Sequence, residues 1–185
     1  MLLAVLCTPA FGQTTATDWL DQGNLLFGQG KYDESVQAYN KAIEIDPQLA
    51  EAWFNKGCAL AQQDKLDEAI QANDKAIEIN PQFASAWANK GNLLVRQGKN
   101  DEAAKALDKA IEIDPNNALA WANKGNLLFG QGKYDEALPI LDKALEIDPN
   151  NALAWNNKGI ALKALSRVTE ANAAFAKAKE LGYSG

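Results

Sequence analysis

Apolar residues recur along this chain at the spacing of an α-helix, and the pattern is interrupted at regular intervals. For example, Ala69 and Ile70 are followed seven residues later by a second Ala-Ile pair, which places all four side chains on one side of a helix. An Asp-Pro or Asn-Pro pair ends four of these stretches, because proline cannot donate the next backbone hydrogen bond. These pairs are Asp46-Pro47, Asn80-Pro81, Asp114-Pro115 and Asp148-Pro149. The pattern predicts helix, turn, helix, turn, repeated five times.

The interruptions return every 34 residues, so the chain is built from repeated units. Each unit has one tryptophan and, four residues after it, a glycine. The tryptophans are Trp19, Trp53, Trp87, Trp121 and Trp155, and the glycines are Gly23, Gly57, Gly91, Gly125 and Gly159. If a unit starts three residues before its tryptophan, the units are 16–49, 50–83, 84–117, 118–151 and 152–185. Residues 1–15 lie outside the repeat.

A glycine inside a helix costs about 0.5–1 kcal/mol relative to alanine, so five of them need a reason. We expect each glycine to allow a close approach of the unit's second helix, whose facing residues are also small. These are Ser35, Ala69, Ala103, Ala137 and Ala171. The tryptophan is expected to be buried and to fill the wider gap beside this contact.

The second helix of each unit is expected to begin at a capping aspartate. The candidates are Asp33, Asp67, Asp101 and Asp135, each followed by a glutamate that complements the positive end of the helix dipole. Further along each second helix a lysine precedes a glutamate by three residues, which predicts a row of ion pairs on a solvated outer face. The pairs are Lys41–Glu44, Lys75–Glu78, Lys109–Glu112, Lys143–Glu146 and Lys177–Glu180.

The composition argues against several classes of function. The chain of 185 residues has a formal net charge of −6, which leaves no basic surface to attract nucleic acid. It has no histidine and only two cysteines, so the commonest general base and a zinc site are both missing. The Asp and Glu residues recur with the repeat and do not converge on one pocket. We therefore expect no enzyme activity, no metal and no cofactor.

Tryptophan, glycine, a following leucine or aromatic residue, two alanines and a proline at a period of 34 resemble the tetratricopeptide repeat (TPR). The resemblance covers residues 16–185 and implies an all-α fold, a right-handed superhelical α-solenoid of antiparallel helix pairs. The sequence departs from the family pattern just before each glycine, where an apolar residue is usual. These positions hold Gln22, Lys56, Lys90, Lys124 and Lys158. We interpret the lysines as a tolerated variant whose stems lie along the helix with the amines in water.

The resemblance also implies which side chains face the concave side of the array. The second, fifth, sixth, ninth, twelfth and thirteenth residues of each unit line a groove, which here holds a row of asparagines and an apolar floor. The asparagines are Asn24, Asn55, Asn89, Asn92, Asn123, Asn126 and Asn157, and the floor includes Phe27, Phe54, Val95, Leu119 and Phe129. An amide both donates and accepts hydrogen bonds, so this row can bind the main chain of an extended peptide. The alternative is that these asparagines bond neighbouring helices or water and only structure the repeats.

One ligand known for the family can be tested on the residues. Cochaperones that hold the acidic C-termini of heat-shock chaperones use lysine or arginine at the fifth, second and sixth positions, together with asparagines. Here the fifth positions are Leu20, Phe54, Ala88, Ala122 and Asn156, and the second and sixth positions hold no lysine or arginine. A terminal carboxylate would lack its cations, so we expect no ligand of this carboxylate-clamp type.

Residues 1–15 resemble a signal-peptide leader, with an uncharged apolar run that ends at Ala10-Phe11-Gly12. The positive residues of a usual leader are missing. Cleavage of the leader would place the protein in the periplasm or outside the cell, and the alternative is a cytoplasmic protein in which this segment caps the array. The run is too short to span a bilayer, so we expect no membrane insertion of the mature array.

The sequence therefore predicts a non-catalytic scaffold or adaptor that binds an extended segment of a partner protein in its concave groove. A second interpretation is a self-assembling structural scaffold or a spacer in a larger complex. Both ends of the array carry polar residues where the inner units are apolar, namely Asp18 in the first unit and Asn172 and Lys179 in the fifth. For that reason we expect a monomer.

Overall fold

The computed structural model describes residues 14–184, where ten helices follow one another in five pairs. The first helices of the pairs are α1 (Ala16–Gly28), α3 (Ala50–Gln62), α5 (Ala84–Arg96), α7 (Ala118–Gly130) and α9 (Ala152–Ala164). The second helices are α2 (Tyr32–Ile45), α4 (Leu66–Ile79), α6 (Asn100–Ile113), α8 (Tyr134–Ile147) and α10 (Val168–Glu180). The predicted all-α solenoid of helix pairs is confirmed. The predicted leader falls almost entirely on residues 1–13, outside the described part of the chain.

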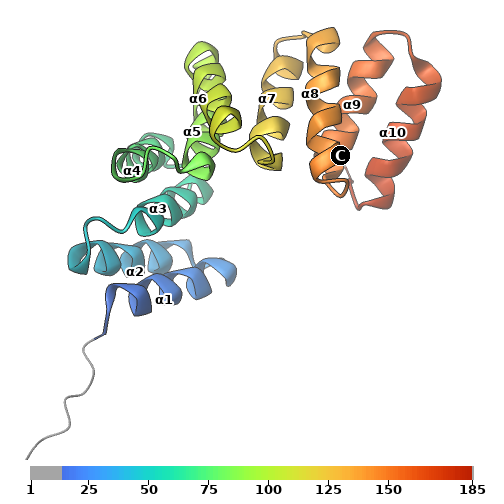
Figure 1. The fold of residues 1–185 in the computed structure, drawn as a ribbon. Helices are drawn as coiled ribbons and strands as arrows, with labels where there is room; N and C mark the ends of the chain where they lie inside the picture. The colour runs from blue at the N-terminus through green and yellow to red at the C-terminus, as the bar shows by residue number, and fades with distance from the viewer. Residues whose placement is uncertain (1–13, 185) are drawn as a thin grey trace, which may run out of the picture.

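Helices that are neighbours in the chain are also neighbours in space, and the array curves (Figure 1). Each helix of residues 14–184 packs on the helix before it and the helix after it, and each odd-numbered helix also approaches the next odd-numbered one. Within the same residues, the backbones of no two even-numbered helices approach each other. The odd-numbered helices are therefore the more closely spaced set and line the inside of the curve. We call the surface that they form the concave surface.

The second helices begin one residue before the predicted aspartates. In the first four repeats they start at Tyr32, Leu66, Asn100 and Tyr134. The residue before each of these is a lysine that makes no side-chain cap hydrogen bond, so the prediction of capping aspartates is wrong. The aspartates and the glutamates after them lie in the first turn instead, where their negative charges interact favourably with the helix dipole.

The glycine of each first helix faces a longer side chain of the second helix and, in two repeats, also the backbone of the small residue that the sequence suggested. A Cβ added at Gly91 would lie 2.6 Å from Cγ of Leu107, and one at Gly125 would lie 2.6 Å from Cδ2 of Leu141. The other three glycines face Tyr39, Asn73 and Phe175 in the same way. The predicted small residue is also close in two repeats, because the carbonyl oxygens of Ala69 and Ala103 would lie 3.2 and 3.4 Å from a Cβ at Gly57 and Gly91. The side chain that meets each glycine was not predicted. The helices of a pair come close because a large side chain of the second helix packs on the bare backbone of the first.

The tryptophans are half-buried, not fully buried as predicted, and four of them are bonded to the loop before their helix. The indole Nε1–H of Trp87 donates to the carbonyl oxygen of Pro81 at 3.1 Å. The same bond joins Trp53 to Pro47 at 3.1 Å, Trp121 to Pro115 at 2.9 Å and Trp155 to Pro149 at 2.9 Å. Each tryptophan thus ties its helix to the turn that connects two repeats.

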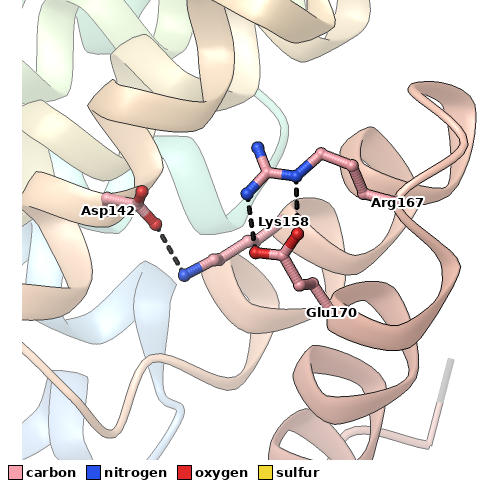
Figure 2. Close-up of polar contacts among 4 residues, drawn as sticks. All are labelled: Asp142, Lys158, Arg167 and Glu170. Atoms are coloured by element: carbon pink, nitrogen blue, oxygen red, sulfur yellow. Dashed lines mark hydrogen bonds and ion pairs between the residues drawn. The ribbon is translucent and has the colours of Figure 1, made fainter.

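The lysine before the glycine bonds to the preceding repeat in three cases. Its Nζ lies 2.6 Å from an aspartate Oδ1 in the pairs Lys90–Asp74, Lys124–Asp108 and Lys158–Asp142. Figure 2 shows Lys158 reaching from α9 to Asp142 of α8, beside the pair that Arg167 and Glu170 form at the start of α10. The interpretation that these amines lie only in water is therefore wrong. The sequence signal was an aspartate sixteen residues before each of these lysines.

The predicted ion pairs on the second helices are all present, with Nζ–Oε distances of 2.6 to 2.9 Å. Their side chains are largely exposed, so they form a solvated outer face and contribute little to stability. Among residues 14–184, no helix is both long and apolar enough to cross a bilayer.

Candidate protein-interaction surface

The asparagines of the concave surface contact one another across the repeats. The side chain at the sixth position of one repeat donates toward the repeat before it. Nδ2 of Asn55 donates to Oδ1 of Asn24 at 2.9 Å, and Nδ2 of Asn157 donates to Oδ1 of Asn126 at 2.6 Å. These amides therefore link α1 to α3 and α7 to α9. These bonds correspond to the interpretation in which the asparagines join neighbouring helices.

In the middle of the array the asparagine at this position has other bonding partners. Nδ2 of Asn89 lies 3.6 Å from Sγ of Cys58 and 3.3 Å from Oδ1 of Asn73. Nδ2 of Asn123 donates to the carbonyl oxygen of Ala88 at 3.5 Å. Asn123 and Asn157 are only 7% exposed. Asn24 is exposed, and Asn55, Asn89, Asn92 and Asn126 are half-buried, so most of the row still reaches the surface.

An acceptor shared by two donors holds the first pair of repeats together. Oδ1 of Asn24 accepts from Asn55 and also from the hydroxyl of Tyr39, at 3.0 Å. Burial raises the pKa of Tyr39 to about 12, with smaller contributions from the charges of Cys58 and Glu51. Tyr39 is therefore a neutral donor at physiological pH. This cluster was not visible in the sequence, because Tyr39 and Asn24 belong to different helices.

The predicted phenylalanines of the concave surface are half-buried, and each lies beside a second aromatic ring. The ring centroids are 5.4 Å apart for Phe27 and Tyr32, and 5.8 Å apart for Phe129 and Tyr134. Phe54 lies 5.0 Å from Phe83, a residue of the loop before α5. Sequence reasoning missed Phe83, because the last position of a unit is not among the groove positions of the family.

Two leucines of the concave surface are well exposed. Leu119 on α7 and Leu153 on α9 occupy the same repeat position and are 49% and 45% exposed. Each lies one turn before an asparagine of the row, on the same face of its helix. Leu119 was predicted to belong to the apolar floor, and Leu153 was missed although it is the equivalent residue of the next unit.

Charged side chains are few on this surface, and one of them is already paired. Arg96 of α5 extends to the end of α3, where Nη2 lies 2.7 Å from Oδ1 of Asp64 and Nη1 donates to the carbonyl oxygen of Ala61 at 3.2 Å. Asp64 has a φ of 60°, at a position where the first, third and fourth repeats have glycine. The arginine thus stabilises a left-handed turn. The concave surface has no cluster of cations.

In the part of the chain that the structure describes, no cluster of side chains could form a metal site. Within residues 14–184 there is no group of three histidine, cysteine, aspartate or glutamate side chains that could hold a metal ion. Burial raises the pKa of the Cys58 thiol to about 11, so it is protonated at physiological pH and a poor nucleophile.

Family models of the tetratricopeptide repeat match most of the chain. One model of that description matches residues 75–118, 88–152 and 122–183, and another matches residues 50–83. A third, described as TPR repeat, matches residues 23–64. The chain belongs to the tetratricopeptide repeat family. No curated protein sequence matches it.

Several solved structures share the solenoid. A crystal structure of the MamA protein is 25% identical with a TM-score of 0.71, over 91% of this chain and 92% of its own. YrrB, a TPR protein with an unusual peptide-binding site, is 24% identical with a TM-score of 0.66, over 92% of this chain and 88% of its own. TTC0263, a thermophilic TPR protein in Thermus thermophilus, is 21% identical with a TM-score of 0.77, over 91% of this chain and 92% of its own. Proteins of this family are interaction scaffolds and typically non-catalytic, and the fold supports that general role here.

Proposed function

We propose that this chain is a non-catalytic scaffold that binds an extended segment of a partner protein along its concave surface. The observation that carries the proposal is the pair Leu119 and Leu153. Both side chains are nearly half exposed at the same position of adjacent repeats. Burial of such side chains by a partner removes apolar surface from water.

The asparagine row supports the proposal because its amides have donors and acceptors that the bonds between repeats do not use. A primary amide has two donors and an acceptor oxygen with two lone pairs, and one bond to the neighbouring repeat uses only part of them. The exposed Asn24 and the half-buried Asn55, Asn89 and Asn126 can bond the main chain of a partner with what is left. Because each hydrogen bond contributes about 0.5–1.5 kcal/mol net, we expect micromolar affinity, or about −8 kcal/mol.

The test is selection of random short peptides on the full chain, followed by binding assays with variants. The double variant Leu119→Ser, Leu153→Ser introduces the residue that the third repeat has at this position, Ser85. It should weaken the selected peptides by about tenfold or more, since two apolar contacts are lost. Peptides bound equally well by this variant would contradict the proposal.

A matched control replaces exposed apolar residues that lie outside the concave surface. Ile45 at the end of α2 and Val168 at the start of α10 are 53% and 57% exposed, and both belong to even-numbered helices. The double variant Ile45→Ser, Val168→Ser loses a similar amount of exposed apolar surface. It should bind the selected peptides like the unchanged chain.

One observation favours a second function, self-assembly through the first repeat. Leu25 of α1 is 64% exposed, whereas the residues at its position in the other four repeats are at most 3% exposed because the preceding repeat covers them. A second copy could cover Leu25 in the same way. Light scattering of the full chain and of Leu25→Gln distinguishes the two functions. Oligomers that dissociate in the variant would favour self-assembly, and a monomer at tens of micromolar would disfavour it.

Export of the protein remains a proposal that rests on the first fifteen residues alone. Sequencing of the N-terminus of protein recovered from cell envelope and culture medium would test it. A mature chain that begins after Gly12 would support cleavage, and a chain that retains Met1 would contradict it.

A further inference from the structure

A cavity of about 570 Å³ opens at the edge of the concave surface, where α3 begins. Its lining comes from the first turns of α3 and from the loop between α4 and α5. We call it the aromatic cup, and its residues are Leu49, Ala50, Glu51, Phe54, Asn55, Asn80 and Phe83. The rings of Phe54 and Phe83, with centroids 5.0 Å apart, form its apolar side. Its volume is that of a typical ligand pocket.

The start of α5, beside the aromatic cup, has no side-chain cap. The residue before α7 is Asn117, whose side chain accepts from the backbone N–H of Ala120 at 3.0 Å, and Asn151 does the same before α9. Phe83 stands at the equivalent position before α5 and makes no side-chain cap hydrogen bond. Leu49, before α3, also lacks such a bond and lines the same cavity, whereas the first helices α1, α7 and α9 are all capped. Within residues 14–184, the two first helices beside the aromatic cup are therefore the two without a side-chain cap. Such departures are expected at functional sites.

Phe54 is a second departure at the same place. Its repeat position is occupied by alanine in the next two units, Ala88 and Ala122, and both alanines are buried. In that part of the array Asn123 of α7 reaches the backbone of α5 at Ala88. Phe54 is half-buried and turns its ring toward Phe83. Two phenylalanines thus stand where the third and fourth units have an alanine and an asparagine and the first has two leucines, and both phenylalanines line the same cavity.

The polar part of the aromatic cup is acidic. Glu51 is exposed at its edge and has no ion-pair partner within residues 14–184. Asn55 and Asn80 supply neutral amides, and no lysine or arginine lines the cavity. Charge complementarity favours a ligand that brings a cation to Glu51 while it fills the apolar part.

A smaller cavity continues from the aromatic cup across α3. It measures about 190 Å³ and is lined by Asn24, Phe27, Tyr39, Asn55 and Cys58. Asn55 lines both cavities, so the two are adjacent on the concave surface. A segment that places a large side chain in the first cavity can place a small one in the second.

We infer that the aromatic cup is the anchor of the peptide-binding surface and takes one large apolar side chain, aromatic or leucine, that is flanked in the partner by lysine or arginine. The inference rests on the proposed function, since it names the chemistry of a partner for the same surface. Two aromatic rings give the anchor residue a large contact area at a fixed place. Glu51 discriminates against acidic segments.

The experiment uses the library of random short peptides selected on the full chain. The selected peptides should contain phenylalanine, tyrosine, tryptophan or leucine next to a lysine or arginine. The decisive variant is Phe83→Asn, which introduces the array's own capping residue. It should lose about ten- to hundredfold in peptide affinity. Its melting temperature should stay near that of the unchanged chain, because the new cap offsets the lost ring contact.

Glu51→Gln is the second variant, and it separates charge from shape. It should weaken the lysine-containing peptides severalfold and make their binding less sensitive to salt. Peptides that bind Phe83→Asn as tightly as the unchanged chain but lose affinity for the Leu119→Ser, Leu153→Ser variant would overturn the anchor and leave the concave binding surface standing. Peptides unaffected by either variant, or a library that yields no binder, would overturn both.

Discussion

Leu107 of α6 packs directly on the backbone of Gly91 in α5, and no space for a methyl group remains between them. Leu107 itself is fully buried. The same arrangement occurs in all five repeats, with Leu in two of them and Tyr, Asn and Phe in the others. The spacing of a helix pair is therefore set by one large side chain against one missing side chain, which makes both residues sensitive to substitution.

We expect Gly91→Ala to destabilise the protein by about 1–3 kcal/mol, because the new Cβ would overlap Leu107. In an ordinary helix interior the same substitution is stabilising. Gly130→Ala is the matched control, since nothing lies within 4 Å of a Cβ added at Gly130. Thermal or urea unfolding measures both variants. A Gly91→Ala protein as stable as the control would contradict this packing.

The second prediction separates the ring of Trp87 from its hydrogen bond. Trp87→Phe keeps most of the ring and loses the bond to Pro81, so it should cost about 0.5–1.5 kcal/mol. Trp87→Ala also loses the packing against buried residues of its own repeat and the next, and should cost about 3 kcal/mol, the lower end of the range for buried aromatics because this ring is half-buried. Equal losses in the two variants would show that the ring contributes nothing beyond its N–H.

The third prediction concerns the one lysine of this kind whose partner position holds no carboxylate. Three lysines pair with an aspartate of the preceding repeat, but the residue equivalent to those aspartates for Lys56 is Asn40. Burial lowers the pKa of Lys56. Asn40→Asp should supply the missing partner, raise that pKa and stabilise the protein by about 0.5–1 kcal/mol at low salt.

The control for this prediction reverses the change in a repeat that has the pair. Asp74→Asn removes the partner of Lys90 and should destabilise the protein by a similar amount. Unfolding at low and high salt measures both variants, and the gain of Asn40→Asp should shrink as salt is added. A stability difference that does not change with salt would rule out an ion pair as its cause.

The fourth prediction concerns alkaline pH. Burial raises the pKa of the Cys58 thiol from 9.0 to about 11 and that of the Tyr39 hydroxyl from 10.0 to about 12. Between these values the unfolded chain has released protons that the folded chain still holds, so stability falls as pH rises. The loss begins near pH 9 for Cys58 and near pH 10 for Tyr39, and both contributions are fully present at neutral pH.

Melting temperatures at pH 8 and about pH 10.5 test this, with Cys58→Ala as the comparison. The variant should lose less stability over that interval than the unchanged chain, while lysine titration affects both equally. Alkylation gives a second readout. At pH 8 iodoacetamide should label Cys58 about a hundredfold more slowly in the folded chain than in denaturant, since the thiolate fraction differs by that factor. Equal rates would contradict a raised pKa.

The period of 34, the order of helices and the family follow from the sequence alone. Tryptophan, glycine and proline act locally or through contacts that recur in each unit, so their positions specify a helix pair without further information. The lysine–glutamate pairs of the outer face are equally local, because both residues lie on one helix three residues apart.

Only the tertiary structure decided where the amides and amines are bonded. Asn55 contacts Asn24, and Lys90 contacts Asp74, because successive repeats come within reach of those side chains. That distance depends on the residues packed between the repeats, such as Phe54 in one place and Ala88 in another. A sequence pattern gives the face on which a side chain lies, but the distance to the next repeat decides whether the side chain meets a neighbour or remains open to a partner.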